Sequence, residues 1–239
     1  MTEQLSPRAQ ARIRTNQRIL AVGRDHLAKY GAAALSLRAI ARDLDLVSSA
    51  VYRYVASRDE LLTMLVVDAY TELADEVTAA HDSAPANDHR EQIRRSCNAF
   101  HDWAVSEPSR YALLYGSPVP GYQAPAEQTT EPGTRVVALL MRTIADAASV
   151  GRPASESAVP DTIDGLDFDS IRTEFDLDID DQHFHFAISL WATVVGLTSL
   201  EVFGQFGAEP GLDLQTLFTL QIDGLLDRIG PGSKNGGFW

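Results

Sequence analysis

The chain has 239 residues, of which 45% are hydrophobic and 22% are charged, and this balance excludes an intrinsically disordered protein. The length allows one large domain or two smaller ones with a substantial core. The formal net charge of −13 would by itself argue against a nucleic-acid partner, because the phosphate backbone repels an acidic protein.

The charge is unevenly distributed along the chain, and this distribution reverses the argument against a nucleic-acid partner. Residues 1–58 hold ten Lys or Arg against four acids, a net charge of +6, whereas the remaining 181 residues carry −19. A small basic head on an acidic body indicates that the head contacts nucleic acid. A basic face that is merely solvated would give the same count, so the charge alone leaves both interpretations open.

The residue types also exclude several kinds of site. The single cysteine, Cys97, excludes a disulfide framework and a zinc site built from several cysteines, and we expect no metal and no cofactor. No nucleophile elbow, phosphate-binding loop, dinucleotide fingerprint or zinc-protease motif occurs, which argues against an enzyme. The N-terminus lacks the apolar core of a signal peptide, so we expect a cytoplasmic protein. The uncharged stretch 182–200 contains His, Ser and Thr, which favours a buried helix over a membrane span.

Hydrophobic periodicity predicts helices nearly throughout the chain, so the expected fold class is all-α. Gly31 ends the first helix, Ser36 caps the second, and Ser57 with Glu60 forms a capping box at the start of a long helix. Asp180 and Asp181 are expected to cap a later helix. The predicted helices span about 15–30, 37–44, 48–55, 58 onward past Val77, 91–106, 134–149, 182–206 and 213–229. A further segment starts at Pro108, and loops are expected at 83–88, 116–133 and 151–181.

Two short helices joined by a tight break within the basic head form a helix-turn-helix arrangement. The second helix of such a pair can lie in the major groove while the first crosses the backbone. Ala50, Val51 and Tyr54 are candidates for its packed side, which leaves Ser48, Ser49, Tyr52 and Arg53 to meet DNA. Any corner between two helices of a helical protein would give the same pattern, so geometry leaves a purely structural role open.

The ordered residues of the head resemble those of a known family. The run 35–44 (LSLRAIARDL), then 51–54 (VYRY) and 57–62 (SRDELL), is similar to the DNA-binding head of the TetR family of bacterial transcriptional regulators, over roughly residues 12–65. The stretch 110–122 resembles one C-terminal subgroup of that family.

The turn between the two short helices departs from the family pattern. The family usually has Gly-Val-Ser there, where this chain has Asp45, Leu46 and Val47. Asp adopts the left-handed conformation that Gly supplies, so we expect an intact turn. Val47 cannot cap a helix, so we expect Ser48 to take over as the cap, which leaves the start of the second helix uncertain by one residue.

The resemblance implies an architecture and a set of contacts. The expected domains are a three-helix head at 1–60, a helical ligand-binding and dimerisation body at 61–230 joined to the head by a long helix, and a flexible tail at 231–239. By the resemblance, phosphates of double-stranded operator DNA are contacted by Ser36, Arg38, Tyr52 and Arg58, and base edges are faced by Ser48, Ser49, Arg53 and Tyr54. The body of a family member forms a two-fold homodimer and binds a small-molecule effector that moves the two heads apart.

The body offers candidates for both roles. Heptad-like stripes on the last two helices predict the dimer interface, although the same residues could close the core of one chain instead. These are Phe184, Ile188, Trp191, Val195 and Val202 on the first helix, and Leu214, Phe218, Ile222, Leu225 and Ile229 on the second. Candidate pocket residues, each of which could also be an ordinary core residue, are Phe100, Trp103, Tyr111, Met141, Ile144 and His185.

The sequence therefore predicts a ligand-responsive, sequence-specific DNA-binding regulator, by the resemblance a repressor that an unidentified effector releases from its operator. The alternative is a dimeric helical small-molecule-binding protein without specific DNA binding, which the altered turn residues keep open. The residues do not name the operator, the effector or the regulated genes, and they do not separate a repressor from an activator.

Overall fold

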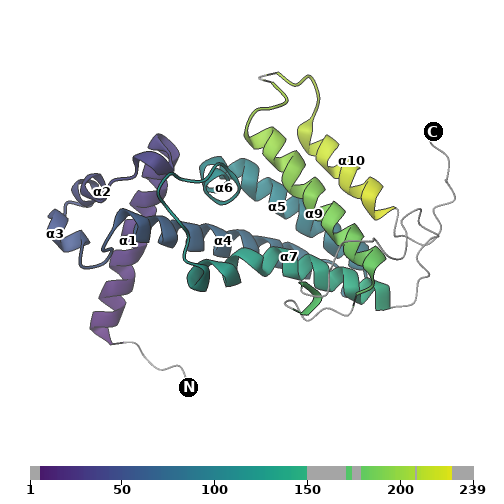
Figure 1. The fold of residues 1–239 in the computed structure, drawn as a ribbon, viewed down its shortest axis with the longest axis horizontal. Coiled ribbons are helices and arrows are strands. Elements are labelled where there is room, and N and C mark those ends of the chain that lie inside the picture. Colours follow the sequence, from purple (N-terminus) through teal and green to yellow (C-terminus); the bar gives the residue numbers. More distant parts are fainter. Residues whose placement is uncertain (1–5, 150–170, 174–178, 208, 228–239) are drawn as a thin grey trace. The chain divides into compact units, whose positions relative to one another are not determined.

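The structure is a computed structural model that describes residues 6–149, 171–173, 179–207 and 209–227 (Figure 1). Within these ranges the ordered elements are helices and no strand occurs, which confirms the all-α prediction. Most of the predicted loop 151–181 and the whole predicted tail 231–239 lie outside the described residues.

The chain divides into two compact units. The first comprises Met1–Glu72 and Glu107–Gly133, and the second comprises Leu73–Ser106 and Thr134–Trp239. Two long helices, α4 (Arg58–Asp82) and α7 (Ala126–Ser149), contribute residues to both units. The functional boundary expected near residue 60 stays a prediction.

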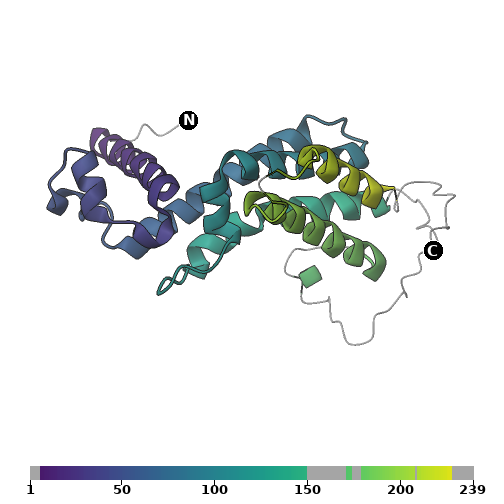
Figure 2. The same cartoon turned by 90° about the horizontal axis from the view of Figure 1, so that it is seen from above.

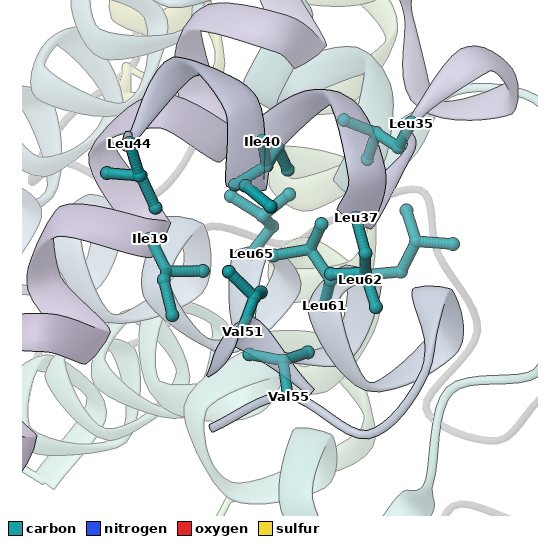
Figure 3. Close-up of a cluster of buried hydrophobic side chains, with 11 residues drawn as sticks. Ile19, Leu35, Leu37, Ile40, Leu44, Val51, Val55, Leu61, Leu62 and Leu65 are labelled. Carbon is teal, nitrogen blue, oxygen red and sulfur yellow. The ribbon is translucent and has the colours of Figure 1, made fainter. Parts of the chain in front are cut away.

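The first unit contains the predicted three-helix head. Its helices are α1 (Pro7–Tyr30), α2 (Leu37–Asp43) and α3 (Ser48–Val51), with a short 3-10 turn, η1 (Ala32–Ala34), between α1 and α2. These elements and the start of α4 enclose one apolar cluster, shown in Figure 3. Its buried members are Ile19, Leu35, Leu37, Ile40, Ala41, Leu44, Val51, Val55, Leu61, Leu62 and Leu65. Each fully buried Leu, Ile or Val side chain stabilises the fold by about 1.5–3 kcal/mol, so this cluster holds the short helices α2 and α3 in place.

α1 begins eight residues before the predicted start at residue 15. The Ser6 hydroxyl accepts a hydrogen bond from the Ala9 N–H at 3.3 Å, and Pro7 occupies the first helical position, where its missing N–H costs nothing. Apolar periodicity could not reveal these turns because their side chains are mostly polar and exposed. At the other end Gly31 has φ +74°, which confirms the predicted stop.

The predicted capping box at the start of α4 forms with one change. The Glu60 N–H donates to the Ser57 hydroxyl at 3.1 Å, as expected. The Glu60 carboxylate accepts from the N–H of Ala56 at 2.5 Å, one residue before the cap position. The backbone N–H groups of Ala56 and Glu60, at the start of the long helix, are therefore both hydrogen-bonded.

α7 begins at Ala126, so the predicted loop 116–133 is wrong over its second half. Pro132 lies inside the helix and removes one backbone hydrogen bond, but the helix continues on both sides of it. Gly133 lies against the ring of Tyr70, because a Cβ at this position would be 3.3 Å from the ring carbons. A proline and a glycine that are typical of loops thus lie inside a closely packed helix. The segment from Pro108 is a helix, α6 (Pro108–Tyr115).

The second unit packs three helices against one another: α5 (His89–Ser106), α9 (Asp181–Val202) and α10 (Leu214–Leu226), and Figures 1 and 2 show α9 and α10 side by side. Asp180 caps α9 as predicted, accepting from the His183 N–H at 2.8 Å. α9 ends at Val202 and not at residue 206, because Gly204 adopts φ +68°. The N–H of Gln205 then donates to the Leu200 carbonyl at 2.7 Å, which closes the helix end.

Two features of the second unit concern the reactivity of its cysteine and the possibility of a membrane span. Cys97 on α5 is fully buried, and burial raises the pKa of its thiol to about 12, so the thiol stays protonated. α9 is, by length and composition alone, long and apolar enough to cross a membrane. One such helix is weak evidence of a membrane protein, and α9 packs here against α5 and α10.

Candidate nucleic-acid interface

The turn between α2 and α3 has the geometry that a helix-turn-helix requires. Asp45 adopts φ +55°, the left-handed conformation expected for the residue that replaces glycine. The Leu46 N–H donates to the Ala41 carbonyl at 2.9 Å, and the Asp45 N–H donates to the Arg42 carbonyl at 3.1 Å. These two bonds form the motif that ends a helix with a left-handed residue. The prediction that Asp45 preserves the turn is confirmed.

α3 starts at Ser48, and the expected capping by Ser48 does not occur. Val47 occupies the cap position with extended backbone and an exposed side chain that cannot accept a hydrogen bond. The helix is also shorter than predicted, because it ends at Val51. Residues 52–54 continue as turns, with the Tyr54 N–H donating to the Val51 carbonyl at 2.8 Å. Val51 and Val55, both fully buried, fix this segment to the core.

The side chains predicted to meet DNA are largely presented to solvent. Ser48, Ser49, Tyr52 and Arg53 are exposed, as is Arg38 on α2. Ser36 is half-buried at the cap position of α2, where its side chain makes no capping hydrogen bond. Val51 and Val55, which are fully buried, hold this segment to the core while Ser48, Ser49, Tyr52 and Arg53 stay exposed.

Two of the residues predicted to contact DNA, Tyr54 and Arg58, also contact other residues inside the head. Tyr54 is half-buried and packs against the apolar cluster, which favours the packed role over base contact. The guanidinium Nη2 of Arg58 donates to the carbonyls of Ala32 at 3.0 Å and Ala33 at 3.2 Å. Arg58 therefore joins η1 to the start of α4, and a phosphate would share it with these carbonyls.

Polar contacts brace α1 against α2. The buried His26 contacts Asp43 through Nε2 and Oδ2 at 2.8 Å, and this hydrogen bond holds the pKa of the Asp43 carboxyl below its ordinary value. Arg18 Nη2 donates to the carbonyl of Leu44, the last residue before the turn, at 3.4 Å. These contacts hold the turn and α3 in one orientation, as a protein that reads base edges requires.

Sequence reasoning missed a charged cluster in the first unit that joins α1, α4 and α6. The buried guanidinium of Arg110 contacts Glu72 and lies 3.3 Å from Asp68, and Arg24 contacts Asp68 at 2.5 Å and Glu72 at 3.4 Å. The hydrogen bond to Asp68 raises the pKa of Arg24. The available signal was the spacing of the two acids, four residues apart on one face of α4.

The predicted pocket residues are distributed over both units. Phe100, Trp103, Met141 and Ile144 are buried in the second unit, where Phe100 packs edge-to-face on Trp191 with ring centroids 5.5 Å apart. His185 is half-buried in the same unit, and Tyr111 is buried in the first. Their role as ligand contacts stays a prediction.

The predicted dimer stripe separates into core and surface residues. Phe184, Phe218 and Ile222 are fully buried within the second unit, so they belong to its core and not to an exposed face. Ile188 is 41% exposed, and the other described members of the stripe are half-buried: Trp191, Val195, Val202, Leu214 and Leu225. Ile229 lies outside the described residues.

Comparisons with known proteins identify the family. A family model described as "Tetracyclin repressor-like, C-terminal domain" matches residues 93–225. Over 220 residues the chain is 46% identical to the HTH-type transcriptional regulator Mb1846 of Mycobacterium bovis, a match that covers 92% of this chain and 94% of that protein. The chain belongs to the TetR family.

Further proteins are similar to this chain in sequence or in fold. The HTH-type transcriptional regulator Rv1816 of Mycobacterium tuberculosis matches with the same identity and coverage. The solved structure of the regulatory protein SCO4313 has a TM-score of 0.72 at 33% identity, covering 92% of this chain and 99% of that chain. The fatty acid degradation regulator FadR of Bacillus halodurans shares the fold, with a TM-score of 0.61 at 13% identity and coverage of 88% and 97%.

Family membership establishes the class of function. The chain is a DNA-binding transcriptional regulator of a family whose members bind operator DNA and act as dimers, and it is not an enzyme. The alternative of a binding protein without specific DNA binding depended on the altered turn residues. With Asp45 in the left-handed conformation, that reason is removed for position 45.

Proposed function

We propose that this TetR-family regulator reads operator base edges through Ser48, Ser49 and Arg53 and holds phosphates through Ser36, Arg38, Tyr52 and, in part, Arg58. The observation that carries this proposal is the orientation of residues 48–53. Val51 and Val55 are fully buried, and the polar side chains between and before them are exposed beside an intact turn. The acidic remainder of the chain is repelled by the duplex, so the basic head alone docks.

Two arginine variants test these assignments. Arg53→Ala should reduce discrimination between operator and altered duplexes by about 1–3 kcal/mol, because an arginine that reads guanine contributes specificity. Arg38→Ala should weaken binding to all duplexes about equally, because Arg38 is exposed and a phosphate contact carries no sequence information. Fluorescence anisotropy with the operator and single-base variants measures both effects. Equal effects of the two substitutions on every duplex would contradict the assignment of Arg53 to base reading.

For the dimer, we propose an interface on the solvent-facing side of α9 and α10. Ile188 and Leu200 on α9 and Phe203 just after it are each more than one third exposed, and Leu220 on α10 is 63% exposed. Large exposed apolar side chains on two adjacent helices are typical of an interface between subunits. Two such helix pairs would form a four-helix bundle about a two-fold axis.

For regulation, we propose that a small-molecule effector binds in the body and releases the operator. The candidate contacts remain Phe100, Trp103, Tyr111, Met141, Ile144 and His185. The Arg110 cluster supports transmission to the head, because the buried guanidinium of Arg110 and its ion pairs tie α6 to α4 and α1. The effector must favour the released state over the DNA-competent one. A compound screen for loss of operator anisotropy tests the proposal, and Arg110→Ala should reduce the response to a compound that it finds.

A further inference from the structure

A groove of about 500 Å³ lies in the first unit beside the segment proposed to read DNA. Arg8 and Arg12 line it from α1, and Arg53 lines it from the turns that follow α3. The other lining residues are Ser6, Ala9, Ala11 and Tyr54, so within the described part of the chain no acidic side chain lines the groove. Three arginines, two on α1 and one in the turns after α3, thus meet around one open groove.

The first turns of α1 are basic, although the start of a helix favours acidic side chains. Residues 6–24 contain five arginines and no Asp or Glu, and the first acid of the helix is Asp25. Arg8 lies in the first turn, where the unsatisfied N–H groups and the helix dipole already give positive potential and favour acids. Arg12 follows four residues later on the same face, and both side chains are exposed. Repulsion among these charges is relieved when an anion enters the groove.

We propose that this groove binds the sugar-phosphate backbone of the operator, next to the base pairs that Arg53 reads. The inference rests on the proposed function of the head. Because Arg53 belongs both to the reading surface and to the groove, a duplex on α3 brings its backbone to Arg8 and Arg12. The start of α1, outside the helix-turn-helix, thereby adds about two phosphate contacts per protomer.

The salt dependence of operator binding tests this directly. The probe is a duplex selected from a random pool by the wild-type protein, with a shuffled duplex of equal length as reference. Each phosphate contact contributes about 0.9 to the slope of log K against log salt concentration. The double variant Arg8→Ala/Arg12→Ala should therefore lower the slope by about 1.8 per protomer, weaken binding at least about tenfold at moderate salt, and keep the ratio of operator to shuffled affinity.

A matched variant separates the groove from general charge loss. Lys29→Ala/Arg142→Ala removes the same two charges from exposed positions outside the groove and should keep the wild-type slope. Both variants place alanine, a good helix former, at exposed helical positions, so they should melt near the wild-type temperature. An unchanged slope in the Arg8→Ala/Arg12→Ala variant, or an equal loss in both variants, overturns the inference. A wild-type protein that binds operator and shuffled duplexes equally overturns the proposed function instead.

Ethylation interference locates the contact on the duplex. Some phosphates should weaken wild-type binding when ethylated but have no effect on the Arg8→Ala/Arg12→Ala variant, and they should neighbour the base pairs at which Arg53→Ala relaxes specificity. The same interference pattern for both proteins would contradict the proposal.

Discussion

Asp45 forms the turn of the helix-turn-helix in a left-handed conformation that suits Asp less well than Gly. At φ +55° the left-handed conformation costs an ordinary residue about 1–2 kcal/mol, less for Asp, and nothing for Gly. A substitution series at this position therefore measures how strongly the head depends on the turn.

Asp45→Gly should raise the free energy of unfolding by up to about 1 kcal/mol, and Asp45→Val should lower it by about 1–2 kcal/mol, because a β-branched residue tolerates this conformation poorly. Denaturant unfolding followed by circular dichroism measures the changes, and operator affinity should fall for the Val variant only. Asp45→Asn is the control for charge, since it removes the carboxylate, keeps the left-handed preference and should stay close to wild type. Equal stability of the Gly and Val variants would contradict the account.

At the scale of the elements, the Arg110 cluster joins α1, α4 and α6 through one buried guanidinium and its ion pairs. Arg110→Ala should lower the free energy of unfolding by about 1.5–3 kcal/mol, because it removes charged hydrogen bonds of a buried guanidinium and leaves Asp68 and Glu72 with Arg24 alone. Arg135→Ala is the matched control, since it breaks a partly exposed pair with Asp75 at 2.7 Å and should cost at most about 1 kcal/mol. Denaturant unfolding compares the two variants. Equal losses would show that the cluster does not hold the three helices together.

The elements also show what the sequence could and could not predict. Periodicity and capping residues located the helices of the head and the stripe of α4, because each buries one regular apolar face. The start of α1 was missed because its first turns bury almost nothing. The start of α7 was missed because Pro132 and Gly133 are typical of loops, whereas the contact of Gly133 with Tyr70 is a tertiary feature.

The residues of the candidate DNA interface also divide into those that the sequence could place and those that it could not. Ser48, Ser49, Tyr52 and Arg53 could be placed on the outer surface from the pattern alone, because the apolar residues of the same segment had to face the core. The carbonyl contacts of Arg58 depend on where η1 lies in space, and no local pattern reveals them. For the same reason, the stripe on α9 and α10 could not be divided into core and surface residues before the packing of α5 was known.

At the scale of the whole molecule, the regulator depends on two copies acting together. Leu220→Glu should shift the dimer toward monomer, because a carboxylate would be buried in the proposed interface without a partner. Gln215→Glu adds the same charge at another exposed position of α10 and should leave the dimer intact. Sedimentation velocity over a range of concentrations measures the equilibrium. A Leu220→Glu protein that stays as dimeric as wild type would place the interface elsewhere.

The net charge of −13 is the sum of a basic head at +6 and an acidic remainder at −19. Sequence-specific DNA binding by the basic head can therefore be measured on the whole protein. Fluorescence anisotropy of the wild-type protein with DNA from its own promoter region, against a shuffled duplex, should show tight, salt-sensitive binding to the promoter DNA and much weaker binding to the shuffled sequence. Equally weak binding to both duplexes at moderate salt would contradict sequence-specific recognition by the head.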